Sequence, residues 1–281
     1  MSFFTKIKNG WNLGMTSLEV IKDNPKLLFF PLLSGMTILL VLSTFVGGIL
    51  NIAGANPDIL NNLNNEHTNS YIFPIAGFIF YLISFFIVIF FNVALVHNAR
   101  LVFDGEDPTV GDGIRYAQSR IGAIFSWSVL AATVAVILKT VREKGGLIGN
   151  ILGSIAGALW SFGTYFVVPV LAYENLSPMD ALRKSVDMMK KNWGEAIGAN
   201  FSFGIFSFLG FIVAMVVTFL LLYLQINPII AIGLGVLLFI LTILASEAAK
   251  TVFLAAAYQY LHDEPHGPFD DDLLDSSFYS K

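Results

Sequence analysis

Cysteine is absent from this chain of 281 residues, and charged residues are scarce, at 13%. Without cysteine the chain has no disulfide framework, no thiolate metal site and no cysteine nucleophile. Ordinary soluble domains carry about 25% charged residues, whereas 56% of this chain is hydrophobic. A single water-soluble core does not hide so much apolar surface, so the composition predicts an integral membrane protein. The 16 Lys and Arg residues are spread between apolar runs, which is not the pattern of a nucleic-acid binder.

Six apolar runs are long enough to cross a bilayer, which takes roughly 20 mainly apolar residues. They lie at 27–53, 71–91 with a weaker extension to 103, 121–138, 147–171, 196–224, and 228–249 with a continuation to 261. The sequence therefore predicts an all-α membrane protein of six transmembrane helices. The third run is short, and the charged cluster 139–144 follows it. A full crossing and a re-entrant or steeply tilted segment are both open for this run.

The distribution of Lys and Arg predicts the orientation. If the N-terminus is cytoplasmic, 13 of the 16 basic residues lie inside, and only Lys139, Arg142 and Lys144 lie outside. The first outside loop, 56–70, has no basic residue. The positive-inside rule then places both termini in the cytoplasm, and we expect a multi-pass protein of a bacterial inner membrane.

The polar segments before the first, third and fifth spans predict amphipathic interfacial helices. Before the fifth span, Leu182, Val186, Met189 and Trp193 recur every three or four residues, and basic residues occupy other positions. An apolar stripe with a basic face is typical of a helix at the membrane surface. The first segment has a similar stripe, and the middle one, 112–120, is shorter and weaker.

Two of these segments also match in sequence. The octet 17–24 (SLEVIKDN) aligns with 185–192 (SVDMMKKN), and 112–115 (DGIR) resembles 180–183 (DALR). We infer three units, at about 1–103, 104–173 and 178–261, each an amphipathic helix followed by a hairpin of two spans. Parallel repeats occur both in transporters and in proteins that transport nothing. After the third unit, residues 262–281 are acidic and are expected to form a disordered tail.

Short motifs in a fixed order carry a family resemblance. They are 9–11 (NGW), 30–35 (FPLLSG), 111–115 (GDGIR), Trp127, 131–133 (AAT), 160–161 (WS), 164–169 (TYFVVP), 181–185 (ALRKS) and 192–195 (NWGE). Together they resemble a family of polytopic bacterial inner-membrane proteins, of about six spans, that is known only as a domain of unknown function. The family's plan is also loosely similar to the membrane domain of glycerophosphodiester phosphodiesterases. The resemblance implies the topology and implies no activity.

Four polar residues inside the apolar runs are candidates for an intramembrane pair or path. Glu247 and Lys250 lie three apart in the sixth run, so they share a helix face. Ionisable groups within a span are functional candidates by default, but these two fall near the cytoplasmic boundary, where a structural pair is the alternative. Asn92 and His97 close the second span, where a span that simply ends and becomes polar explains them equally well.

Small residues at four-residue spacing mark two faces for close helix packing. They are Gly149, Gly153, Gly157 and Ser161 in the fourth run, and Gly194, Gly198 and Ser202 at the start of the fifth. An intramolecular contact and an oligomer seam both fit this pattern. Further along the fourth run, Pro169 is a candidate kink or a site that exposes a carbonyl group.

No phosphate-binding loop, zinc motif or serine nucleophile elbow is present, so we expect no catalytic site, no metal and no cofactor. A structural or membrane-organising role is the leading hypothesis, with the bilayer as partner and a second copy or other membrane proteins as further partners. The alternative is a channel or transporter for a small solute or ion. A lipid-acting enzyme is the least supported, because no carboxylate and histidine cluster accompanies the loose phosphodiesterase resemblance.

Overall fold

The structure is a computed structural model that describes residues 3–55, 72–191, 193–262, 264–269 and 274. Within these residues all regular elements are helices. They are α1 (Phe3–Asp23), the 3-10 helix η1 (Pro25–Leu28), α2 (Phe29–Ala55), α4 (Ile72–Phe103), α5 (Val110–Ser119), α6 (Ile121–Lys144), α7 (Gly146–Gly163), α8 (Val167–Tyr173), α9 (Pro178–Lys191), α10 (Trp193–Tyr223) and α11 (Pro228–Tyr260). The predicted loop at 56–70 lies outside the described residues.

Six helical segments of the described chain are long and apolar enough to cross a membrane, and this confirms the predicted set. They are Pro25–Gly48, Pro74–Phe103, Ile121–Lys144, Gly146–Tyr173, Phe203–Tyr223 and Pro228–Tyr260. The third is continuous over 24 residues, which is about 36 Å of helix and enough for a full crossing. The fourth is interrupted between α7 and α8.

The interruption of the fourth segment precedes Pro169, the predicted kink. Proline has no N–H to donate to the carbonyl four residues earlier, which here belongs to Tyr165. The chain forms turns at 164–166 and then begins α8 at Val167. The backbone N–H of Phe166, left free by the turn, donates to the hydroxyl of Ser185 in α9, at 3.0 Å. The break is therefore stabilised by a neighbouring helix.

Most buried apolar side chains belong to one cluster, which we call the hub. The hub joins α1, η1, the start of α2, the C-terminal half of α4, α5, the first half of α6, α8, α9, the first half of α10 and the C-terminal half of α11. Its members include Leu13, Val20, Leu27, Phe30, Val93, Ala94, Leu95, Val96, Ala99, Ile124, Phe166, Val170, Leu171, Ala181, Met189, Val252, Phe253, Ala256 and Ala257. The hub thus contains one end of each predicted span, and in every case it is the end that we expected on the cytoplasmic side.

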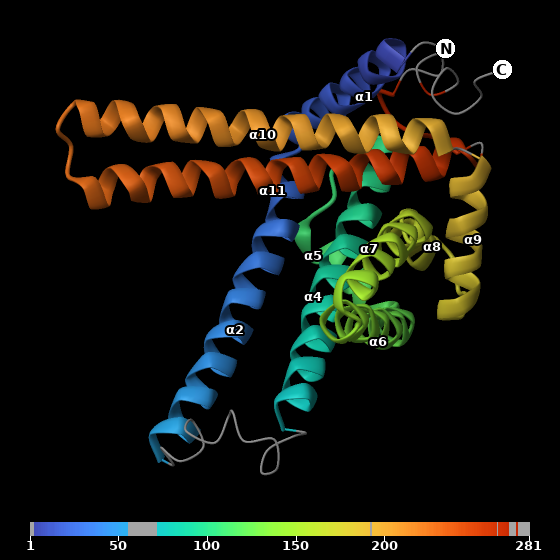
Figure 1. The fold of residues 1–281 in the computed structure, drawn as a ribbon. Helices are drawn as coiled ribbons and strands as arrows, with labels where there is room; N and C mark the ends of the chain where they lie inside the picture. Colours follow the sequence, from blue (N-terminus) through green and yellow to red (C-terminus); the bar gives the residue numbers. More distant parts are fainter. Residues whose placement is uncertain (1–2, 56–71, 192, 263, 270–273, 275–281) are drawn as a thin grey trace.

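Away from the hub, the long helices continue as pairs that point in different directions. Figure 1 shows α10 and α11 side by side, running across the direction of α2 and α4, while α6 is viewed nearly along its axis. Large apolar side chains on these outer parts are exposed, for example Leu39, Ile151 and Phe219. Such surfaces suit the hydrocarbon of a bilayer.

The outer parts of α10 and α11 meet through two reciprocal contacts. A Cβ atom at Gly210 of α10 would collide with the side chain of Thr242 in α11, and one at Gly235 of α11 would collide with Thr218 in α10. Each threonine hydroxyl donates to the carbonyl four residues earlier in its own helix, at 2.8 Å for Thr218 and 2.9 Å for Thr242. Small residues therefore set the close approach of this pair, as is common between membrane helices.

The three helices that begin the predicted units bury the same aligned positions. The first position is Leu13 in α1, Gly113 in α5 and Ala181 in α9, and the second, four residues later, is Ser17, Ala117 and Ser185. All six residues are buried. Because the two positions of each helix are four residues apart, they lie on the same face of that helix. The described residues of the predicted apolar stripes range from buried Ile21 and Met189 to exposed Met15. A position at the membrane surface stays a prediction for these helices.

Helices α5 and α9 also begin with the same set of polar contacts. Thr109 caps α5, and its hydroxyl donates to Asp112 at 2.6 Å, while Arg115 pairs with the same carboxylate at 2.6 Å. In α9 the corresponding contacts join Ser177 to Asp180 at 2.6 Å and Asp180 to Arg183 at 3.2 Å. These contacts support the predicted repeat, whose unit boundaries stay a prediction.

Part of the segment expected to be a disordered tail packs on the hub. Phe269 is buried, and its ring meets Phe103 of α4 edge to face, with the centroids 6.0 Å apart. Leu274 is fully buried as well. Although the segment is acidic overall, its few aromatic and aliphatic side chains can still be buried against protein. Phe269 and Leu274 thus belong to the hub, while the disorder expected for the tail as a whole stays a prediction.

Candidate functional site

Glu247 and Lys250 lie on α11, just where that helix enters the hub. Glu247 is exposed and Lys250 is half-buried, whereas Ala248 and Ala249 between them are fully buried. No ion pair between Glu247 and Lys250 occurs in the described structure. Three-residue spacing places both on one side of the helix, but the structure does not join them, and their function stays a prediction.

Asn92 and His97 lie in the part of α4 that enters the hub, and both are half-buried. The His97 ring stacks on Tyr116 of α5, with the centroids 3.8 Å apart and the planes 2° from parallel. Fully buried Asn98, next to it, donates from its side-chain amide to the carbonyl of Thr109 at 2.8 Å. These contacts fasten α5 to α4, and no described hydrogen bond, ion pair or ring contact links His97 to Glu247 or Lys250.

The glycine row of α7 is a seam within the chain. A Cβ atom at Gly149 would collide with the carbonyl of Val141, and one at Gly153 would lie 2.5 Å from Cγ of Arg142. At Gly157 it would lie 2.5 Å from Nη2 of Arg142. The glycines therefore leave the groove in which the long side chain of Arg142 lies. Ser161, the fourth member, is exposed.

The other predicted row, Gly194, Gly198 and Ser202, belongs to α10. The surroundings of these three residues lie outside the described part of the structure. The choice between an intramolecular and an intermolecular contact for this row stays open.

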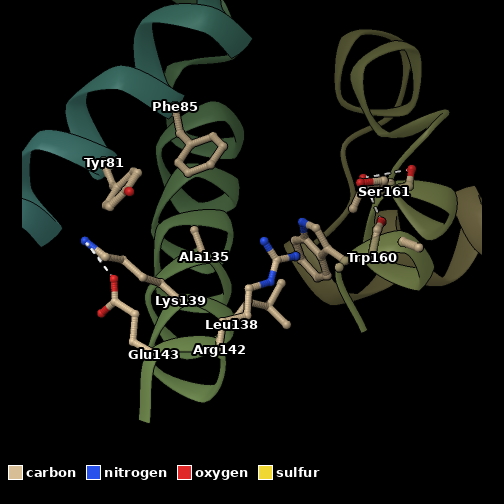
Figure 2. A pocket seen from close by; sticks show the side chains of 12 residues that line it. Tyr81, Phe85, Ala135, Leu138, Lys139, Arg142, Glu143, Trp160 and Ser161 are labelled. Carbon is tan, nitrogen blue, oxygen red and sulfur yellow. Dashed lines mark hydrogen bonds and ion pairs between the residues drawn. The ribbon is translucent and has the colours of Figure 1, made fainter. Parts of the chain in front are cut away.

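A cavity of about 880 Å³ lies between α4, α6 and α7. Its wall is formed by Tyr81, Phe85, Ala135, Leu138, Lys139, Arg142, Glu143, Gly157, Ala158, Trp160, Ser161 and Thr164. Figure 2 shows the side chain of Arg142 leaving α6 toward the part of α7 that carries Trp160 and Ser161. Lys139 and Glu143 form an ion pair one helical turn apart, at 3.9 Å. The cavity thus combines three charged side chains with aromatic rings and hydroxyl groups.

A second group of polar side chains ties the hub together. Glu174, which follows α8, accepts a hydrogen bond from the hydroxyl of Tyr258 in α11 and pairs with Lys184 of α9. Tyr258 stacks on Tyr173 with the centroids 4.9 Å apart, and the guanidinium of Arg100 in α4 lies 5.3 Å from the Tyr173 ring centroid. One network therefore connects α4, α8, α9 and α11.

Sequence reasoning did not find these two groups. In the sequence, Lys184 is one of the basic residues between the apolar positions of 182–193, and Arg142 is one of the charged residues of 139–144. Neither position indicates a partner on another helix. The signal for Arg142 was the glycine row, since glycines at four-residue spacing leave a groove that a neighbouring helix or a long side chain fills. Glu174 and Tyr258 are 84 residues apart, and no local pattern brings them together.

Comparison with known proteins places the chain in a family without assigning an activity. No curated protein matches the chain, and the loose similarity to phosphodiesterase membrane domains stays a prediction. One family model, described as a family of unknown function (DUF6159), matches residues 71–268. This stretch contains five of the six candidate spans, the cavity and the polar network of the hub. Because the match covers more than half of its length, the chain belongs to the family of unknown function DUF6159.

Proposed function

We propose that this protein has a structural role in the membrane, organising the bilayer and neighbouring membrane proteins around the hub, and that it is not an enzyme. The observation that carries the proposal is the contrast in packing along the long helices. Burial is concentrated in the hub. The outer parts of the long helices diverge (Figure 1), and their large apolar side chains are exposed. Divergent helix pairs fixed by a rigid base hold lipid and partner helices at set positions between them.

The proposal includes an inner-membrane location with both termini in the cytoplasm. Two features support this orientation. Helix α1 lies against α11, and both enter the hub, so the start of α1 and the end of α11 belong to the same end of the molecule. Among the described residues, the basic side chains away from the hub end are Lys139, Arg142 and Lys144, near the turn between α6 and α7.

Reporter fusions test this orientation. A reporter inserted between Gly145 and Gly146 is expected to be active only outside the cytoplasm, and a reporter fused after Lys281 only inside. A cytoplasmic signal at Gly145 would overturn the orientation. The C-terminal fusion, which the same model requires to be inside, is the internal control.

The alternative function is a channel or transporter for a small solute or ion. The cavity between α4, α6 and α7 favours it, because Lys139, Arg142 and Glu143 line it within or at the end of a candidate span. Flux through reconstituted liposomes separates the two functions. We expect the flux of inorganic ions, amino acids and sugars to equal that of protein-free liposomes.

The structural role also makes a positive prediction. Lipids and proteins that co-purify with the wild type in mild detergent are expected to be retained by the variant Leu237→Ala, whose altered side chain lies in the outer part of α11. They are expected to be lost when Ala256→Leu disrupts the hub. Saturable flux of any solute that Arg142→Gln abolishes would contradict the structural role and establish transport.

A further inference from the structure

The side chain of Arg142 extends toward the middle of its helix pair. Arg142 lies in the last turn of α6, yet its Nη2 atom reaches the position where a Cβ of Gly157 would stand, at 2.5 Å, and donates to the carbonyl of Gly153 at 3.1 Å. Side chains on a helix tilt toward its N-terminus, so the residue's own geometry directs it this way. The groove left by Gly153 and Gly157 gives it room.

The depth of the guanidinium follows from the length of α7. Gly157 is the twelfth residue of that helix, which begins at Gly146, so it lies about 16 Å along the axis from the turn. The hydrocarbon layer is about 30 Å thick. A guanidinium near Gly157 is therefore well inside the layer if the turn lies at the membrane surface, whereas long basic side chains near helix ends normally reach outward to water.

The described protein supplies no anion to this guanidinium. The neighbouring carboxylate, Glu143, pairs with Lys139 at 3.9 Å, and no described carboxylate lies within 4.0 Å of Arg142. The lining of the cavity carries two cationic groups and one anionic group. A cationic group inside a membrane is normally paired with an anion or with backbone carbonyls, and Arg142 has one recorded carbonyl partner.

Other lining groups provide hydrogen-bond donors and an apolar wall. Tyr81 of α4 and Ser161 of α7 contribute hydroxyl groups, and Trp160 contributes an indole N–H. The Trp160 ring is stacked on Trp127 of α6, with the centroids 5.8 Å apart and the planes 5° from parallel, which fixes its position. Phe85 supplies part of the apolar wall (Figure 2).

We propose that this cavity binds one anionic group of the phosphate or carboxylate type, held by Arg142, with the donors of Trp160 and Ser161 on the α7 side. Lys139, paired with Glu143, and Tyr81 lie on the other side of α6 (Figure 2). The planar guanidinium presents parallel N–H groups that match two oxygens of such an anion. The anion is either carried on a lipid head group or free in solution, and the thermal-denaturation experiment below distinguishes these two sources. The site is independent of the structural role proposed above.

Fluorescence of Trp160 offers a direct test with the full-length protein. Nanodiscs are prepared from neutral phosphatidylcholine with a minor fraction of brominated phosphatidylglycerol, or with the same fraction of brominated phosphatidylcholine. Bromine quenches tryptophan on contact, and Trp160→Phe gives the background from the other tryptophans. We expect the anionic lipid to quench Trp160 more strongly than the neutral lipid does.

The variant Arg142→Gln is expected to weaken the apparent affinity for the anionic lipid about tenfold or more, since a charge-assisted bidentate contact is lost. Arg142→Lys keeps the charge without the paired donors and is expected to fall between the two. Lys144→Gln is the matched control, because Lys144 belongs to the same turn of α6 and does not line the cavity. It is expected to bind as the wild type does.

A further experiment distinguishes a free anion from a lipid head group as the occupant of the site. If inorganic phosphate or glycerol phosphate, added to nanodiscs of neutral lipid, protects the protein against thermal denaturation in an Arg142-dependent manner, the site takes free anions. If only the anionic lipid acts, it takes a lipid head group. Equal quenching by the two brominated lipids, together with no phosphate effect, overturns the proposal.

A second variant guards against loss of folding. If Arg142→Gln does not fold, Ser161→Ala removes one donor from the wall, and its exposed side chain is not part of the helix seam. A several-fold weaker affinity in this variant supports the site. An unchanged preference for the anionic lipid in both Ser161→Ala and Arg142→Lys overturns it.

Discussion

Residues 228–243 and residues 248–259 belong to the same helix, α11, and differ in what surrounds them. In the outer part, Leu237 is 52% exposed and Ile240 is 46% exposed. In the inner part, Val252, Phe253 and Ala256 are exposed by 1% or less. Both parts lie within one candidate span, Pro228–Tyr260, and its most apolar stretch of 18 residues is only 17% buried. The surface that faces lipid is therefore the outer part of α11, and the surface that faces protein is the inner part.

The two parts also differ in side-chain size. The outer part is rich in leucine, isoleucine and valine, whereas five alanines stand in the inner part, Ala248, Ala249, Ala255, Ala256 and Ala257. Small residues let neighbouring helices approach closely, and without a hydrophobic driving force inside lipid, packing is a main source of association. The alanine-rich part is where α1 and α4 lie against α11.

The largest expected effect comes from enlarging a side chain in the inner part. Ala256→Leu adds three carbon atoms at a position with no exposed surface, and overpacking a well-filled core costs about 3 kcal/mol at this scale. Leu237→Ala in the outer part is the control, because lipid chains replace the contacts that are lost. Thermal denaturation of both variants in nanodiscs measures the difference. An equal loss of stability in the two variants would contradict the division of α11 into hub and lipid-facing parts.

The sequence predicted the six spans well, because each is a long apolar run and hydropathy reports transfer into lipid. It also predicted the correspondence of 112–115 with 180–183, and the structure gives these two segments the same carboxylate and arginine contacts. Local patterns of this kind depend on neighbours in sequence, so they are visible without tertiary structure.

The cavity and the hub network were not predictable in the same way. Arg142 belongs to a charged cluster at a helix end, and only its rotamer and the glycines of α7 show that it extends inward. Glu174 meets Lys184 and Tyr258 because the turn after α8 and the packing of α9 bring them together. Phe269 packs on the hub through an aromatic contact with Phe103. The average composition of its segment does not indicate this contact, because aspartates surround Phe269.

A smaller effect distinguishes two aligned serines within the hub. Ser185 accepts a hydrogen bond from the backbone N–H of Phe166, on another helix. Ser17 donates to the carbonyl of Leu13, in its own helix, at 2.8 Å. Ser185→Ala leaves a buried N–H without its partner and is expected to cost about 1–2 kcal/mol. Ser17→Ala is expected to cost less, since the carbonyl of Leu13 keeps its place within the helix.

Thermal denaturation of the two alanine variants, each compared with the wild type, measures this difference. Hydrogen exchange at the amide of Phe166 adds a local readout and is expected to speed up only in Ser185→Ala. If Ser17→Ala proves as costly as Ser185→Ala, the two serines play the same packing role, and the bond across the break in the fourth span adds nothing.

The smallest expected effect lies at the water-exposed rim of the hub, where Asp112 begins α5. Hydrogen bonds from the hydroxyl and backbone N–H of Thr109 lower the pKa of the Asp112 carboxyl below its ordinary value of 3.8, and the guanidinium of Arg115 adds to this. The folded state therefore favours the carboxylate. This contribution is complete above pH 3.8 and is lost as the pH falls through the lowered pKa.

Asp112→Asn removes the titration while keeping a side chain of the same shape. The difference in melting temperature between wild type and variant is expected to be present above pH 3.8 and to shrink below it. If Asp112→Asn does not change the pH dependence, the cap of α5 fixes only the direction in which that helix starts. In that case the hub's stability comes from its alanine-rich packing, because the rim would contribute nothing that titrates.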